Sequence, residues 1–237
     1  MNAAKLSPRN LLLRQLDGAI FDTITSSLEP VEYTVSEVLS DIEAPLSHVH
    51  FPENGVISVL ATYANGDTIE MTTIGREGLA GIEGTLGAQN ANARYYAQMR
   101  GSGYRMPREE LLRFIDGIPK FRMLVFNYIQ AFINQLLISG ACNGKHPVQA
   151  RLARWLLTME DRSDGPSLFL THHFLADMLG AYRPTVSLAL TQLQSAGLIE
   201  TRRAQIVIRD RAGLETVSCE CYALSKNTYA RLLRWQS

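Results

Sequence analysis

The spacing of apolar positions divides the chain into helical and extended stretches. Apolar side chains recur every four residues from Leu12 to Ile24, which predicts a helix over residues 8–27. From about residue 28 to residue 106, turn residues separate short apolar runs every eight to twelve positions, which predicts strands. Helical spacing returns afterwards and dominates the rest of the chain. The pattern therefore predicts a β-rich region between helices, and hence an α+β protein.

The extended region contains five apolar runs. They are Val31–Val35, His48–Phe51, Val56–Tyr63, Thr68–Ile74 and Ala93–Met99. Asn65-Gly66, between the third and fourth runs, predicts a hairpin, because this dipeptide favours the tight turns that join antiparallel strands. We expect Asn54-Gly55 and Gly101-Ser102-Gly103 to end strands. Short strands without long helices predict a small sandwich or barrel.

A long helix is predicted from about Lys120 to Cys142, after a short one from Pro107 to Asp116. Two apolar stripes run along the long helix. The first has the 4-3-4 spacing of a coiled-coil seam and consists of Val125, Ile129, Phe132 and Leu136. The second consists of Phe126, Ile133 and Leu137. One stripe can pack on the chain's own strands and leave the other for a partner helix, and we assign the first stripe to a dimer interface. Burial of both stripes within one chain is the alternative.

Asn143-Gly144 is expected to end the long helix, and Pro147 is expected to start the next one. That next helix is predicted over Gln149–Asp161. Its apolar positions share one face, which predicts packing against a neighbouring element; they are Leu152, Trp155, Leu156 and Met159.

The most specific pattern lies between Thr171 and Ile199 and predicts two short helices joined by a tight turn. Gly180 falls in the turn, where we expect a positive φ. Pro184 suits the first turn of the second helix, because its missing N–H has no intrahelical partner there. Small or apolar residues at the remaining spacing would close a core between the two helices; they are Leu175, Ala176, Leu179, Ala181, Val186 and Ala189. This is the spacing of a helix-turn-helix.

The residues that follow predict a winged helix. Leu198-Ile199 begins a short strand, Arg202-Arg203 forms a basic turn, and Gln205–Ile208 is rich in β-branched residues. A plain helical hairpin with a solvated Arg183 is the alternative, but it does not explain a strand pair with a basic tip. In a DNA-binding winged helix, the start of the second helix enters the major groove.

The charge distribution supports a nucleic-acid partner, although the formal net charge is zero. Residues 1–144 carry 11 Lys and Arg against 15 Asp and Glu, which gives −4; residues 145–237 carry 12 against 8, which gives +4. The basic half is the half that contains the helix-turn-helix. No uninterrupted apolar run approaches the ~18 residues of a membrane span, and Arg14-Gln15 interrupts the only apolar run near the N-terminus, so we expect neither a membrane anchor nor a signal peptide.

The order of these features, together with the segment LTHHFLADMLGAYRPTVSLALTQLQSAGLI, resembles the Crp/Fnr family of bacterial transcriptional regulators. The resemblance covers nearly the whole chain and is most specific in the helix-turn-helix. It implies a cupin-like β-roll (a double-stranded β-helix) with the role of a sensor in residues 1–118, a dimerisation helix in 119–144 and a winged helix-turn-helix in 145–237. It also implies a homodimer that binds a palindromic promoter site and, if it activates, contacts RNA polymerase.

The resemblance also assigns roles to residues of the DNA-binding region. Arg183 matches the arginine at the start of the family's recognition helix, and Ser187 matches a base-reading serine. Pro184 and Leu188 stand where the family often has an acidic residue and a second arginine, so the operator is expected to differ; Leu188 could pack on a thymine methyl group. Phosphate contacts are implied for Thr171, His172, His173, Arg202 and Arg203.

The effector is not given by the sequence. Members that bind cyclic nucleotides have a Gly-Glu segment followed some ten residues later by Arg-Ser/Thr-Ala. The candidate segments here are Gly75–Gly81 and Asn90–Tyr95, and the second lacks that triplet; Arg94 could replace its arginine only with a shift in register. A phosphate needs such an arginine because charge-assisted pairing offsets its desolvation. We therefore predict no cofactor and argue against cyclic AMP.

The cysteines are three, an odd number that argues against a disulfide framework and favours a reducing cytoplasm. Iron–sulfur clusters need about four Cys ligands. Only one residue separates Cys219 from Cys221, whereas the paired cysteines of a zinc knuckle have two to four intervening residues. Gly144 separates Cys142 from His146, so we do not expect that pair on one helical face. We predict buried structural thiols and no metal site, with a redox-reactive Cys142 as the alternative.

Two other function classes were weighed. A ligand-binding regulatory module whose winged helix contacts a protein partner is the alternative to a DNA-binding regulator, and the arginines of the winged helix favour DNA. An enzyme is not expected, because the sequence has no nucleophile elbow, phosphate loop, zinc-protease motif or convincing carboxylate pair. We therefore assign no catalytic residue.

Overall fold

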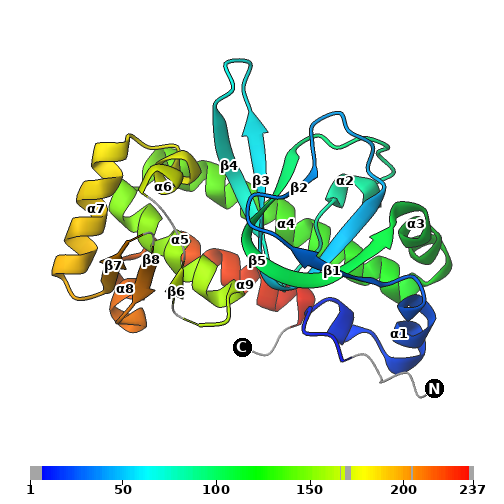
Figure 1. Cartoon of the computed structure of the whole chain (residues 1–237). Helices are drawn as coiled ribbons and strands as arrows, with labels where there is room; N and C mark the ends of the chain where they lie inside the picture. The colour runs from blue at the N-terminus through cyan, green and yellow to red at the C-terminus, as the bar shows by residue number, and fades with distance from the viewer. Residues whose placement is uncertain (1–6, 166, 169–171, 204, 235–237) are drawn as a thin grey trace. The chain divides into compact units, whose positions relative to one another are not determined.

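The computed structural model describes residues 7–165, 167–168, 172–203 and 205–234 (Figure 1). An N-terminal β-sheet domain is followed by one long helix and by a helix-turn-helix with a small β-hairpin wing. The α+β class predicted from the apolar spacing is confirmed.

The N-terminal segment contains less helix than the single helix predicted over residues 8–27. A 3-10 turn, η1 (Leu13–Gln15), precedes helix α1 (Gly18–Thr25). Leu16 between them is extended, and the Asp17 carboxylate accepts a hydrogen bond from the Ile20 amide at 3.0 Å. The prediction of one helix over residues 8–27 was wrong because Asp17 caps a new helix start.

The N-terminal sheet consists of five strands in the order β1-β5-β3-β4, with β2 also paired to β5. The strands are β1 (Glu29–Tyr33), β2 (Val38–Ser40), β3 (His48–Thr62), β4 (Thr68–Ile74) and β5 (Arg94–Pro107). The run Thr68–Ile74 forms a strand with the predicted bounds. Strands β3 and β5 are much longer than predicted.

The glycines expected to end strands instead permit close contact between them. A Cβ at Gly101 would lie 2.3 Å from the Asn54 carbonyl oxygen, and one at Gly103 would lie 2.4 Å from the Phe51 carbonyl oxygen. Strand β5 therefore continues past both residues, and β3 continues through Gly55, which has a φ of 81°. Glycine in a strand can mark a close backbone approach rather than a chain reversal.

One short helix lies between strands β4 and β5, and two further helices follow β5. The short helix α2 (Ile82–Thr85) precedes β5, and α3 (Arg108–Gly117) confirms the predicted short helix. Helix α4 spans Pro119–Lys145 and so continues through the predicted break at Gly144. The His146 amide still donates to the Cys142 carbonyl at 3.0 Å, and the helical bonds stop at Pro147, which has no N–H.

The two apolar stripes of α4 differ in solvent exposure, and the stripe that was assigned to the dimer interface is the buried one. Val125, Ile129 and Phe132 are only 1%, 8% and 4% exposed, because they belong to the chain's own core, and Leu136 is half-buried. The opposite stripe is exposed: the exposed fractions are 56% for Met123, 44% for Phe126, 49% for Ile133 and 68% for Leu137. The stripe assigned to the dimer interface from the sequence is therefore not the one left for a partner.

Helix α4 is also long and apolar enough, by length and composition alone, to cross a membrane. The core helix of a globular protein passes the same test. The buried stripe that contains Val125 and Phe132 gives α4 that role here.

The C-terminal part contains five helices and a three-stranded sheet of order β6-β8-β7 among the described residues. They are α5 (Val148–Arg162), β6 (Ser167–Leu168), α6 (His172–Leu179), α7 (Arg183–Ser195), β7 (Ile199–Arg202), β8 (Gln205–Ile208), α8 (Arg211–Val217) and α9 (Cys221–Leu233). The predicted inward face of α5 is confirmed, since Leu152, Trp155, Leu156 and Met159 are buried.

The chain divides into two compact units. The first comprises Met1–Ser58 and Thr73–Gln130, and the second comprises Val59–Thr72 and Ala131–Ser237. The outer part of the β3–β4 hairpin thus belongs to the same unit as the helix-turn-helix. Within this unit the Trp155 indole N–H donates to the Glu70 carboxylate at 2.8 Å, and both side chains are buried.

Candidate nucleic-acid interface

The turn between α6 and α7 has the predicted conformation. Gly180 has a φ of 53°, and the amide of Ala181 donates to the Ala176 carbonyl at 3.0 Å, which satisfies an end carbonyl of α6. The predicted core between the two helices is confirmed, because Leu175, Ala176, Leu179, Val186 and Ala189 are buried, with Ala181 half-buried. The turn is therefore fixed by both backbone geometry and apolar packing.

Two contacts from outside the motif hold this turn. The buried guanidinium of Arg151, on α5, donates to the Leu179 carbonyl at the end of α6. The side chain of Ile69, on β4, lies 3.7 Å from the position that a Cβ on Gly180 would occupy. Ile69, on the β3–β4 hairpin, thus lies beside the turn of the helix-turn-helix.

The start of α7 presents an exposed surface. Arg183 and Pro184 are exposed, Leu188 is 58% exposed and Ser187 is half-buried. Among the described residues, the Arg183 guanidinium makes no ion pair within 4 Å. Tyr182, at the N-cap position, is 77% exposed and was missed by the sequence analysis. The sequence feature that could have pointed to Tyr182 is a large aromatic residue directly before the predicted recognition helix.

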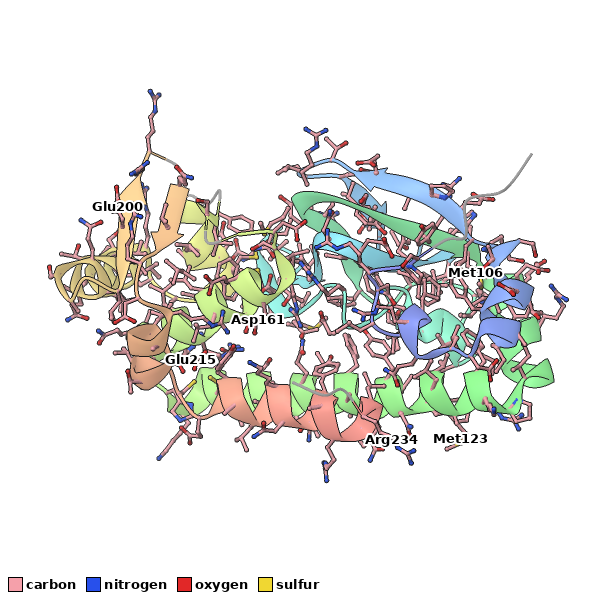
Figure 2. The ribbon with its side chains drawn as sticks, turned by 90° about the horizontal axis from the view of Figure 1, so that it is seen from below. Met106, Met123, Asp161, Glu200, Glu215 and Arg234 are labelled. Atoms are coloured by element: carbon pink, nitrogen blue, oxygen red, sulfur yellow. The ribbon has the colours of Figure 1, made fainter. Side chains whose placement is uncertain are left out.

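Some of the arginines in and beside the wing are paired with a carboxylate of the same chain. The guanidinium of Arg202 donates to Glu200 at 2.6 Å, and that of Arg209 donates to the other carboxylate oxygen at 2.8 Å. These two hydrogen bonds lower the pKa of Glu200 below its ordinary value, so it stays ionised. Figure 2 labels Glu200 on strand β7. Arg203, at the tip of the wing, is exposed. Among the described residues it makes no such ion pair.

The remaining predicted phosphate contacts are only partly described. Thr171 lies outside the described residues. His172 and His173 form the first turn of α6, as predicted, but their side chains are outside the description.

A network of polar contacts fixes α8 and α9 to α5. Arg211, at the start of α8, pairs with Glu160 at 2.6 Å, with Asp161 at 2.7 Å and with Glu215 at 3.1 Å. The Tyr222 hydroxyl donates to Asp161 at 2.8 Å. Figure 2 labels Asp161 and Glu215, the carboxylates at the two ends of this network. Polar contacts therefore join the start of α8 and the start of α9 to the end of α5.

In the N-terminal unit, the residues that matched a nucleotide-binding segment are engaged within the chain. Arg94 donates two hydrogen bonds to Asp41, at 2.9 and 2.7 Å. A Cβ on Gly78 would lie 2.3 Å from the Tyr128 ring, whose hydroxyl donates to the Leu79 carbonyl at 2.9 Å. The Gly75–Gly81 segment is thus covered by an aromatic side chain from α4.

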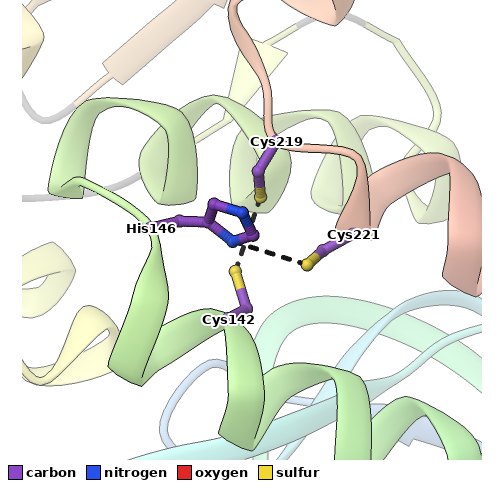
Figure 3. Close-up of side chains that lie close together, drawn as sticks. All are labelled: Cys142, His146, Cys219 and Cys221. Carbon is purple, nitrogen blue, oxygen red and sulfur yellow. Dashed lines mark hydrogen bonds between the residues drawn. The ribbon is translucent and has the colours of Figure 1, made fainter.

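The structure also brings together four residues that the sequence analysis had treated as two unrelated pairs. Cys142 lies in the last turn of α4 and His146 directly follows that helix, while Cys219 precedes α9 and Cys221 is its first residue (Figure 3). The hydrogen bond with Cys219 lowers the pKa of the Cys142 thiol and raises that of Cys219. The pairs are separated by more than seventy residues, which is why local spacing did not connect them.

Solved structures share this fold. FixK2 from Bradyrhizobium japonicum is 20% identical, with a TM-score of 0.63 over 81% of this chain and 98% of that chain. TTHB099, a CRP-family transcriptional regulator from Thermus thermophilus, is 19% identical, with a TM-score of 0.65 over 79% and 96%. CLP from Xanthomonas campestris, described as a c-di-GMP-responsive global regulator, is 15% identical, with a TM-score of 0.62 over 81% and 99%. No curated protein sequence matches the chain.

The family model of the Crp-like helix-turn-helix domain matches residues 150–217. The chain therefore contains a Crp-like helix-turn-helix domain. The matched residues contain α6, α7 and the wing. Members of the Crp/Fnr family are DNA-binding transcriptional regulators and not enzymes.

Proposed function

We propose that the chain is a Crp/Fnr regulator that acts in the cytoplasm as a homodimer and inserts α7 of each chain into successive major grooves of a palindromic promoter site. The exposed start of α7, which packs on α6 through a buried apolar core, is the observation that supports this most directly. A recognition helix with exposed side chains at its N-terminal end has the geometry that major-groove reading requires.

We assign base reading to the first two turns of α7. Arg183 is placed to donate two hydrogen bonds to the O6 and N7 atoms of guanine, and Ser187 is placed to bond to a neighbouring base. Leu188 offers an apolar surface to a thymine methyl group, and Pro184 fixes the start of the helix beside them. The exposure of Arg183, Pro184 and Leu188 supports this assignment.

We assign phosphate binding to the start of α6 and to the wing, through Thr171, His172, His173, Arg202 and Arg203. Arg203 is exposed at the wing tip and can meet a phosphate directly. Arg202 first has to exchange its bond with Glu200 for one with a phosphate. We therefore expect Arg203 to contribute more to phosphate binding than Arg202.

The dimer contact that we propose runs along the exposed stripe of α4. Met123, Phe126, Ile133 and Leu137 lie on this stripe, and exposed Gln130 completes the spacing of three and four residues. This is the repeat of a coiled-coil seam, and a polar side chain at one seam position sets the register of the two helices. A second copy of this chain is therefore the partner whose shape fits the stripe.

The regulatory arrangement follows the domain order of the family. We propose that residues 1–118 sense a signal, that 119–144 pair the chains and that 145–237 bind DNA, with RNA polymerase as a further partner if the protein activates. Pairing of Arg94 with Asp41 favours an effector other than cyclic AMP. The buried bond between Glu70 and Trp155 gives a route by which the β3–β4 hairpin can act on the DNA-binding domain.

Salt dependence separates DNA binding from the alternative in which the winged helix contacts a protein. Fluorescence anisotropy with a labelled duplex is measured over a range of salt concentrations for the wild type, Arg203→Ala and Arg231→Ala. Loss of one phosphate contact should flatten the plot of log affinity against log salt by about one unit for Arg203→Ala. Arg231, an exposed arginine on α9, is the matched control and should leave the slope unchanged. A wild-type affinity that does not vary with salt would favour the protein-partner alternative.

A further inference from the structure

Four side chains with metal-binding atoms converge in the unit that contains the DNA-binding domain. Cys142 comes from the last turn of α4, His146 directly follows that helix, Cys219 lies between α8 and α9, and Cys221 is the first residue of α9. Their donor atoms all lie within 4.8 Å of one another, and Figure 3 shows the four side chains directed at a common point. The three thiols are buried and pack with the apolar side chains of Ile138 and Ala150.

The distances fit a single tetrahedral ion. A zinc ion about 2.3 Å from sulfur and about 2.0 Å from nitrogen places two sulfurs roughly 3.8 Å apart and a sulfur and a nitrogen roughly 3.5 Å apart. The Cys142 and Cys219 sulfurs are 3.4 Å apart, and the Cys221 sulfur is 3.6 Å from His146 Nδ1. The same separation of Cys142 and Cys219 is far longer than the ~2.05 Å of a disulfide.

The other ring nitrogen of His146 has the partner that a ligating histidine usually has. Its Nε2 lies 3.3 Å from a carboxylate oxygen of Glu220. A hydrogen bond from this nitrogen to a carboxylate fixes the tautomer in which Nδ1 is free to bind a metal. Glu220 stands between the two ligating cysteines in the sequence, so one short segment supplies two ligands and this support.

We propose that Cys142, His146, Cys219 and Cys221 bind one Zn²⁺ ion in a closed Cys₃His site. Soft thiolates with one imidazole, arranged tetrahedrally, select zinc over the hard cations Mg²⁺ and Ca²⁺. An iron–sulfur cluster distributes its cysteines over several irons and so spreads them more widely than four donors around one ion. Three thiolates with Zn²⁺ have a net charge of −1, and the positive charge of Arg154 acts on all three thiols.

The position of the site gives the ion a structural role. His146 is the last residue before Pro147, the N-cap of α5, and α5 opens the DNA-binding domain. The ion would tie the C-terminal end of α4 to the start of α9 across the junction at which α4 gives way to α5. Because all four ligands act together only in the folded chain, metal binding contributes directly to folding stability.

Metal content of the full-length protein tests the proposal. The chain is expressed in zinc-supplemented medium, freed of any histidine tag, purified without chelators and analysed by plasma mass spectrometry. We expect about one zinc per chain in the wild type and at least a tenfold loss in Cys219→Ser and His146→Gln. His48→Gln, a histidine on β3, is the matched control and should retain the ion. A wild type with less than a tenth of a zinc per chain, or variants that keep it, would overturn the site.

Two measurements on the wild type keep the test independent of whether a variant folds. Replacement of zinc by Co²⁺ should give intense visible bands and a sulfur-to-cobalt charge-transfer band, the signature of tetrahedral thiolate ligation. Thiol titration of the denatured, chelated protein should give three free thiols per chain, in agreement with three reduced cysteines. One free thiol would show a Cys142–Cys219 or other disulfide, and iron with acid-labile sulfide would show a cluster; either result would overturn the zinc site.

Discussion

The two units of the chain treat their polar residues in opposite ways. At the start of α7, Arg183 is exposed and Tyr182 extends into solvent, so the groups that can bind a ligand are available. In the β-sheet unit, Arg94 is bound to Asp41, and the Gly78 segment is covered by Tyr128. A ligand that binds Arg94 would therefore have to displace its bonds to Asp41, whereas Arg183 makes no ion pair within 4 Å among the described residues.

This difference explains why function could be assigned to one unit and only its fold to the other. The recognition surface is one continuous segment whose residues face outward together. In the β-sheet unit, Arg94 and the Gly78 segment make contacts within the chain instead. The following predictions test whether that contrast is real, beginning with the largest expected effect.

Disruption of the exposed stripe of α4 should have the largest effect on DNA binding. In Leu137→Glu a charge is placed on the proposed seam, so the two winged helices lose their fixed spacing. Two linked sites typically gain 100-fold or more over one, so we expect affinity for a palindromic duplex to fall by roughly that factor. Sedimentation should show a monomer. Leu224→Glu changes another exposed leucine, on α9, and should stay dimeric; loss of dimers there as well would contradict the stripe.

Removal of the proposed guanine contact should have the next largest effect. Arg183→Ala should cost about 1–3 kcal/mol on the selected site and relax the preference at one base position in each half-site. Binding to random duplex should change much less, because phosphate contacts remain. The comparison of the two duplexes by anisotropy decides the role. An equal loss on both would show that Arg183 binds phosphate instead of a base.

Overpacking at Gly78 should affect stability and leave DNA reading intact. A Cβ there would collide with the Tyr128 ring, so Gly78→Ala should lower the free energy of unfolding by about 1–3 kcal/mol. Gly84→Ala is the control, because its Cβ would find its nearest neighbour at 3.6 Å, an ordinary contact distance. Thermal unfolding of both variants gives the difference. Equal melting temperatures would mean that Tyr128 does not cover the segment.

Release of Arg202 from Glu200 should have the smallest effect, and it should raise DNA affinity instead of lowering it. Glu200→Gln removes the carboxylate that binds Arg202 and Arg209, so non-specific DNA affinity should rise a few-fold and the salt slope should steepen by about one unit. Glu215→Gln, in the network behind the wing, is the control with the same change of charge. If both variants steepen the slope alike, overall charge and not the wing pair is responsible.

The parts of the structure that follow from short-range spacing could be predicted from sequence. The helix-turn-helix core and the positive φ of Gly180 are set by residues within a few turns of each other, and both were confirmed. The strands across Gly101 and Gly103 were not predicted, because a glycine signals a turn or a close approach equally well until the neighbouring strand is known.

Contacts distant in sequence account for the other differences. The periodicity of α4 shows two stripes, but only the packed chain shows that Phe132 is inside and Ile133 outside. Cys142 and His146 were set aside because Gly144 was expected to end the helix, and Cys219 lies far away in sequence. No local spacing could show that the end of α4 meets the start of α9.

Selection from a random pool of DNA duplexes with the purified wild-type protein tests the central claim most directly. The account predicts enrichment of an inverted repeat whose half-sites are centred about one helical turn, roughly 10 base pairs, apart. Arg183→Ala, selected in parallel, should lose one base preference from each half. Enrichment of a single unrepeated site, or of the same repeat with Arg183→Ala, would contradict a dimer that reads DNA through α7.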